Sequence, residues 1–108
     1  LGPAGRVHAN FDDVFKYLAA HRDRDASFLR GESWDVLHTP PFGGPYAMGW
    51  QRQGDALWHN GSNTLFYAEV MFDRMHGVLA AAAVNDGRAG EVRPHVGAAL
   101  LGAAEAVT

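Results

Sequence analysis

The first clear pattern in the chain is that of an amphipathic helix. Apolar residues recur at helical spacing between residues 10 and 23, and they fall on one face: Phe11, Val14, Phe15, Leu18 and Ala19. Asn10 is a favourable N-cap, and aspartates at 12 and 13 suit the positive end of the helix dipole. The pattern therefore predicts a helix over 10–23, which the charged run at 22–25 ends.

A second, shorter helix is expected from Glu32 to His38, with Trp34 and Leu37 facing the core. The segment 39–45 that follows holds three prolines and two glycines. Such a segment cannot form a regular element, so we expect a loop.

After this loop the hydrophobic period changes to that of strands. We predict four of them, at 46–53, 56–59, 65–72 and 78–84. The first two are joined by a tight turn at Gly54–Asp55. The fourth is apolar on both sides, which predicts a place in the middle of the sheet, covered by helices.

The chain returns to a helical pattern from Pro94, which suits the first turn of a helix. One face of this final helix is expected to hold Val96, Ala99, Leu100, Ala103 and Val107. The element order predicts an α+β fold in which an antiparallel β-sheet meander packs with N-terminal and C-terminal helices. At 108 residues and 47% hydrophobic content, we expect a single domain over 1–108.

The charge and composition of the chain disfavour some classes of binding partner. The net charge is −3, and acidic and basic residues are interspersed without a Lys/Arg cluster. This argues against nucleic acid and against an anionic membrane as partners. The longest apolar run, 78–84, is too short to cross a bilayer. The chain begins without Met, which we interpret as a sign of a processed product or a fragment.

Metal and cofactor chemistry is not expected. The chain has no cysteine, which excludes disulfides and thiolate metal sites. None of its six histidines is spaced as H-x-H or H-x-x-x-H, so we assign them surface or capping roles. A small metal or ligand sensor built on these histidines is the hypothesis that the spacing disfavours.

Four motifs, taken in order, resemble one enzyme superfamily. They are the Pro-Ala-Gly segment within 2–5, the Tyr-Ala-Met-Gly-Trp of 46–50, His59-Asn60-Gly61, and the apolar strand ending in Asn-Asp-Gly at 85–87. Their order is similar to the C-terminal part of serine β-lactamases and penicillin-binding-protein-like enzymes, closest to the class C β-lactamase and carboxylesterase branch. The resemblance covers nearly the whole chain. It implies a fragment of the β-lactamase/transpeptidase-like fold.

Two motifs of that superfamily are missing. No serine is followed by lysine in the S-x-x-K spacing, and no tyrosine begins Y-x-N or Y-x-S. In the superfamily both motifs precede the Pro-Ala-Gly segment. The resemblance therefore implies that the nucleophile, its lysine and the tyrosine belong to a preceding segment, and that this chain is inactive alone.

The resemblance also assigns roles to the residues around position 60. His59 stands where the superfamily has lysine or histidine, and Asn60 is placed to hydrogen-bond the substrate. Gly61 leaves clearance for the acylated substrate, and Ser62 offers its backbone N–H to the oxyanion hole. The catalytic candidates are thus His59 and Ser62, and the substrate-binding candidates are Asn60 and Gly61. The alternative is a plain hairpin between Trp58 and Leu65, in which His59 is a satisfied residue beside the turn.

Two functional hypotheses follow. The favoured one is a C-terminal segment of a β-lactamase-like serine hydrolase that forms and hydrolyses an acyl-enzyme from an ester, amide or β-lactam. Its partners would be a small acyl substrate in the intact protein and the missing N-terminal segment. The alternative is a non-catalytic α+β binding or scaffolding module that self-associates through its sheet.

Overall fold

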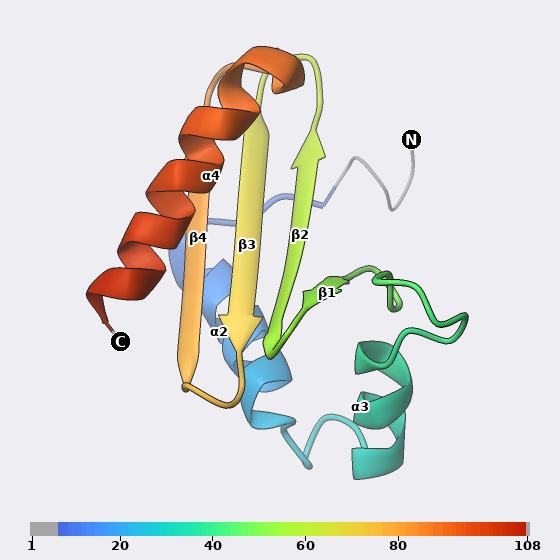
Figure 1. Cartoon of the computed structure of the whole chain (residues 1–108). Coiled ribbons are helices and arrows are strands. Elements are labelled where there is room, and N and C mark those ends of the chain that lie inside the picture. Colours follow the sequence, from blue (N-terminus) through green and yellow to red (C-terminus); the bar gives the residue numbers. More distant parts are fainter. Residues whose placement is uncertain (1–6, 108) are drawn as a thin grey trace.

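The computed structural model describes residues 7–107, and the Pro-Ala-Gly segment therefore lies outside the described residues. Four antiparallel strands form one sheet in the order β1-β2-β3-β4. Helix α4 (Ala89–Ala106) covers one face of the sheet and helix α2 (Phe11–Asp23) covers the other (Figure 1). Both helices contact β3 (Tyr67–Asp73) and β4 (Val78–Val84). The predicted α+β class, with its antiparallel meander, is confirmed.

Helix α2 begins where the sequence predicts. The Asn10 side chain accepts a hydrogen bond from the Asp13 backbone N–H at 2.9 Å, which caps the helix. Leu18 is fully buried beneath it. Phe11 and Phe15, however, are 51% and 38% exposed and stack on each other at 6.2 Å. The sheet therefore covers only part of the apolar face of α2.

Helix α3 (Gly31–His38) follows, one residue longer than predicted. Trp34 is buried as expected, and its indole Nε1 donates to the Asp25 carbonyl oxygen at 3.1 Å. Leu37 is only half-buried, while its carbonyl oxygen accepts from the Met48 N–H at 3.3 Å. This bond ties the helix to the loop that leads into the sheet.

The strand predicted over 46–53 is wrong in its first half. Strand β1 comprises only Gln51–Gln53, and Tyr46 forms an isolated bridge with Gln51. Between them the chain folds back at Gly49, whose φ of 82° is readily adopted by glycine. The Ala47 N–H donates to the Trp50 carbonyl oxygen at 2.7 Å across this turn. The turn buries the side chains of both Ala47 and Trp50. In a straight strand, residues 47 and 50 would point to opposite faces.

Strand β2 (Ala56–Ser62) runs three residues beyond its predicted end, and pairs along its whole length with β3. The turn comes at 63–66. There the Asn63 side-chain oxygen accepts from the N–H groups of Leu65 and Phe66, each at 2.8 Å. Asparagine commonly stabilises turns through such bonds.

The fourth strand has its predicted bounds, but its predicted place is wrong. β4 is an edge strand, paired only with β3. It is apolar on both sides because α2 and α4 pack on its two faces. The predicted cover of β4 by helices is confirmed. This cover alone explains why β4 is apolar on both sides, so the apolar run does not require a central place in the sheet.

Helix α4 begins at Ala89, five residues before the predicted start, so Pro94 lies inside the helix. Its buried residues follow a spacing of four: Val96, Leu100 and Ala104. The prediction was right for Val96 and Leu100. It was wrong for Ala99, Ala103 and Val107, which are exposed.

The core divides into two clusters, one on each face of the sheet. The α2 side holds Leu18, Ala47, Trp50, Leu57 and Phe72. The α4 side holds Met71, Val78, Ala80, Leu100 and Ala104. Alternate residues of β3 supply the two clusters, as expected where helices cover both faces of a strand.

Candidate functional site

All four predicted site residues lie in the second half of β2, which leads into the β2–β3 turn. His59, Asn60, Gly61 and Ser62 pair in register with residues 70, 69, 68 and 67 of β3. A plain hairpin does form here, as the alternative expects, but its turn lies at 63–66, so Asn60 and Gly61 belong to the strand and not to the turn. The question becomes what this stretch of strand can present to a ligand.

Strand alternation divides the four residues between the two faces. His59 lies on the α2 face, where its ring is 6.5 Å from that of Trp50, and Gly61 has the same parity. Asn60 lies on the α4 face, where its amide Nδ2 donates to the Tyr67 hydroxyl at 3.0 Å, and Ser62 has its parity. The imidazole of His59 and the hydroxyl of Ser62 therefore cannot act as a direct pair. A ligand held at the outer edge of the strand would contact the Ser62 backbone.

The outer edge of β2 is open beside Asn60 and Ser62. The Asn63 N–H donates to the Phe66 carbonyl oxygen at 3.0 Å, which makes 63 and 66 a hydrogen-bonded pair. In an antiparallel ladder such pairs alternate, so the backbone groups of Asn60 and Ser62 point away from β3. Strand β1 pairs only with residues 56–58. Within residues 7–107, no backbone hydrogen bond is formed at this edge by Asn60 or Ser62, and in Figure 1 no strand lies beside it.

Gly61 has no structural explanation within the described chain. Its φ does not lie in the positive region, and a Cβ built on it would meet no atom within 4 Å. Glycine weakens a strand interior, and it often marks a place where a ligand or another backbone approaches closely. An exposed glycine between two open N–H groups is therefore consistent with ligand access.

The end of β2 is supported by the loop that leads into α4. A Cβ on Gly87 would overlap the Asn63 carbonyl oxygen and lie 2.6 Å from the carbonyl carbon of Thr64. Gly87 thus allows the two loops to pack backbone against backbone. This contact holds the β2–β3 turn, and with it the position of Ser62.

A buried polar chain lies behind the candidate site on the α4 face. The Tyr67 hydroxyl accepts from Asn60 and donates to the Glu69 Oε1 at 2.5 Å. Tyr67 is 1% exposed and Glu69 7%. Burial, followed by the bond to Glu69, raises the pKa of Tyr67. Sequence reasoning missed this chain, although Glu69 as the only charge among the inner residues of its strand was a signal.

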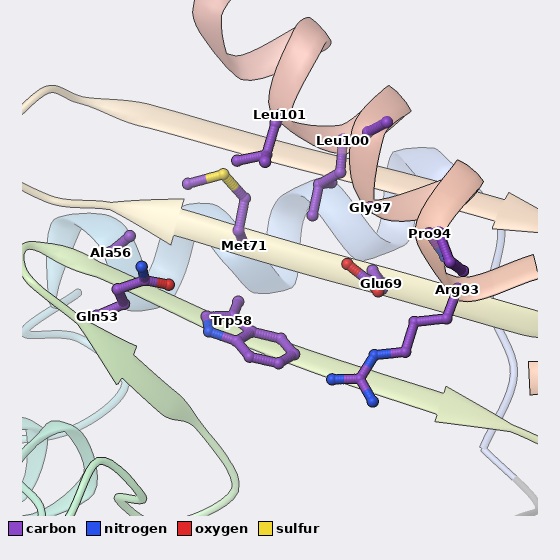
Figure 2. A pocket seen from close by; sticks show the side chains of 11 residues that line it. Gln53, Ala56, Trp58, Glu69, Met71, Arg93, Pro94, Gly97, Leu100 and Leu101 are labelled. Carbon is purple, nitrogen blue, oxygen red and sulfur yellow. The ribbon is translucent and has the colours of Figure 1, made fainter. Parts of the chain in front are cut away.

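Two hollows flank this polar chain. A small cavity of about 300 Å³ is lined by Asn60, Gly61, Ser62, Tyr67 and the start of α4, including Arg93. A groove of about 550 Å³ lies over β2 and β3 beside α4, where Trp58, Met71 and Leu100 form apolar walls (Figure 2). Glu69 and Arg93 are its charged residues. Trp58 is half-buried and forms part of this groove.

Two histidines that are far apart in sequence form a pair on the α2 face. His21 Nδ1 and His38 Nε2 are 2.9 Å apart, and the His21 ring contacts those of Trp34 and Trp50. Burial lowers the pKa of each to about 4, and in His38 the neighbouring His21 and three arginines add to this effect. His21 is buried, so a surface role is wrong for this residue, while His38 is half-buried. No group of three metal-ligating side chains occurs among residues 7–107.

Comparison with protein-family models, curated proteins and solved structures finds no match. Among the described helices, none has the length and apolar character that a membrane span requires. Functional assignment therefore rests on the geometry of the site itself.

Proposed function

We propose that this chain is the C-terminal segment of a β-lactamase-like serine hydrolase. In this proposal β2 forms one wall of the substrate cleft, and the Ser62 N–H stabilises the oxyanion during acyl transfer from an ester, amide or β-lactam. The observation that carries the proposal is the open edge at Asn60 and Ser62, next to a glycine that neither backbone conformation nor packing requires.

In this proposal, different residues of β2 contact different parts of the substrate. A substrate lying along the open edge meets the Ser62 N–H without obstruction from the Gly61 position. His59 is exposed on the same face as Gly61, beside Trp50, where it can hydrogen-bond the substrate. The loop contact at Gly87 holds the donor in place. Preorganised N–H donors of this kind stabilise the charge that develops on a carbonyl oxygen.

The nucleophile is not proposed to come from this chain. No serine here has a lysine three residues on, and the Ser62 hydroxyl lies on the face opposite His59. A preceding segment would supply the serine, lysine and tyrosine of the superfamily pattern. The isolated 108-residue chain is accordingly expected to hydrolyse no ester.

The first test is the intact mass and sequence of the native gene product. A longer product carrying S-x-x-K and Y-x-N motifs would support the proposal, and it would then be assayed with nitrophenyl esters and a chromogenic cephalosporin. A native product of only 108 residues would exclude the hydrolase function for this polypeptide.

The decisive variant in the longer enzyme is Ser62→Pro, which removes the proposed N–H donor together with the side-chain hydroxyl. Proline is tolerated on an open strand edge because no ladder bond is lost. Loss of an oxyanion donor lowers kcat about 10²–10³-fold. Ser62→Ala is the matched control, and it should retain activity because the backbone N–H remains. Equal losses in both variants would show that the side chain, and not the N–H, matters.

The alternative is a non-catalytic module that self-associates through its sheet. It is favoured by two large apolar side chains left exposed at the β2–β3 turn, Leu65 and Phe66, beside the open edge of β2. Contiguous exposed apolar surface marks protein interaction sites. Light scattering on the native product would detect the association. A stable dimer of 108-residue chains without esterase activity would favour this module over the hydrolase.

A further inference from the structure

A polar cavity of about 550 Å³ lies at the end of the sheet opposite to Ser62. It is formed where α3, β1 and the β3–β4 turn meet, and its lining includes Leu57 of β2. Leu57 and Ser62 are five residues apart on one strand, which corresponds to about 17 Å. The cavity is therefore separate from the candidate site described above.

We propose that this cavity binds the oxyanion of a small ligand, a carboxylate or a phosphate group. Three arginines from three different segments line it: Arg24 at the end of α2, Arg52 in β1 and Arg74 in the β3–β4 turn. Arginine presents planar N–H donors that match the geometry of carboxylate and phosphate oxygens.

The positive charge of these arginines converges on one place. His38 also lines the cavity, and its pKa is lowered first by burial, then by His21 and by the charges of Arg24, Arg52 and Arg74. Two aspartates, at 35 and 55, complete the charged lining. Three arginines against two aspartates leave the cavity positive when His38 is neutral.

Two of the arginines are held in position by backbone carbonyl groups. Arg24 Nη2 donates to the Gly31 oxygen at 2.7 Å and pairs with Asp35. Arg52 Nη1 donates to the His38 carbonyl oxygen at 3.1 Å. These bonds orient the guanidinium groups before a ligand arrives, which reduces the entropy cost of binding.

Donor capacity remains after these bonds are counted. The Nε of Arg24 is buried and has no hydrogen-bond partner within residues 7–107. Arg74 forms no ion pair or hydrogen bond in the same part of the chain. Buried donors without partners are rare in folded proteins, so the Arg24 Nε–H is a donor that an oxyanion in the cavity could satisfy. Phe72 and Leu57 add an apolar wall against which the carbon part of a ligand could pack.

The test is a titration of the ¹⁵N-labelled chain, followed through the arginine side-chain Nε–H signals. Sodium phosphate and sodium benzoate would be added separately, with ionic strength held constant by chloride. We expect saturable, single-site shifts at Arg52 and Arg74 with at least one of the two anions. Saturation by phosphate alone assigns a phosphate ligand, and saturation by benzoate alone assigns an organic acid. Linear shifts with both anions would overturn the proposal.

Charge-matched variants show where binding occurs. Arg74→Gln lies in an exposed turn and should leave the fold intact while weakening binding about tenfold or more, because a charge-assisted bond is lost. Arg52→Gln should have a similar effect, with urea unfolding as the check on its stability. Arg30→Gln removes the same charge from an exposed residue outside the cavity and should leave binding unchanged. Equal weakening by Arg30→Gln and Arg74→Gln would also overturn the proposal.

Discussion

The two faces of the sheet differ in how completely they are covered. On the α2 face, Phe72 is 1% exposed and its ring lies 4.9–5.6 Å from those of Trp50, His21 and His38. On the α4 face, one helix covers β3 and β4, and a groove remains over β2 (Figure 2). Both faces hold a core cluster, and on the closed face it is built largely from aromatic rings. The half-covered face and the open edge of β2 leave room for a ligand or a partner.

The largest effect that tests this contrast comes from two neighbouring residues of β3. Phe72 faces α2, while Met71, 8% exposed, faces the groove. Phe72→Ala should lower the free energy of unfolding by about 3–5 kcal/mol, because a large cavity forms inside a closed ring cluster. Met71→Ala should cost only about 2 kcal/mol, since an open groove can relax or admit water. Urea unfolding of both variants measures the difference, and equal losses would contradict the contrast.

The histidine pair makes the closed face sensitive to acid. The pKa values of His21 and His38 are about 4 in the folded protein, against an ordinary value near 6.5. The unfolded chain therefore binds more protons between these values, so stability falls as the pH drops from about 6.5 to 4. Each histidine contributes up to about 1.4 kcal/mol per pH unit over this window.

Unfolding free energies measured between pH 7 and pH 4 check this slope. His38→Gln should flatten it by removing one titrating member of the pair. His95→Gln, an exposed position on α4, is the control and should leave the slope as in the native chain. An unchanged slope in His38→Gln would show that the pair does not govern the acid response.

The polar chain on the half-covered face should contribute less than the aromatic cluster. Tyr67→Phe removes the hydroxyl that links Asn60 to Glu69, and so leaves a buried carboxylate with one bond fewer. Loss of a partner by a buried polar group costs about 1–3 kcal/mol. Tyr17→Phe is the matched control. Its ring is 58% exposed, so the loss should stay within about 0.5 kcal/mol in thermal or urea unfolding. Equal losses would show that the polar chain adds nothing.

Local sequence signals predicted which helices and strands form better than they predicted where each one begins and ends. The Asn10 cap and the apolar run of β4 were both confirmed because each depends on nearby residues. The end of β2 was misplaced because Asn60-Gly61 has the composition of a turn, while the side chain that makes the turn belongs to Asn63. The position of β4 at the sheet edge follows from the meander order, because the last strand of a meander pairs on one side only. The apolar pattern of β4 indicated cover by helices and not a central place.

The candidate site was predictable only in part. Once the limits of β2 are known, alternation places His59 and Ser62 on opposite faces. The open edge follows only from the shortness of β1, which results from the turn at Gly49. The contact of His21 with His38 joins residues 17 positions apart in two helices, and no spacing rule predicts it.

The smallest expected effect on stability is also the most informative about the site. Gly61→Ala places a methyl group where no atom lies within 4 Å, at a backbone conformation open to alanine. Its unfolding free energy should therefore stay within about 0.5 kcal/mol of the native value. Gly87→Ala provides the contrast, because its methyl group would overlap the backbone of 63–64 and should cost about 1–3 kcal/mol.

Urea unfolding of the two variants, measured side by side, shows whether each glycine is required by the fold or by the ligand. If Gly61→Ala is neutral for folding but abolishes activity in the longer enzyme, the glycine serves the ligand and not the fold. If Gly61→Ala destabilises the chain as much as Gly87→Ala does, Gly61 has a structural role that the open edge does not explain. In that case the bare edge of β2 would be a consequence of strand geometry alone, and the hydrolase proposal would lose its main support.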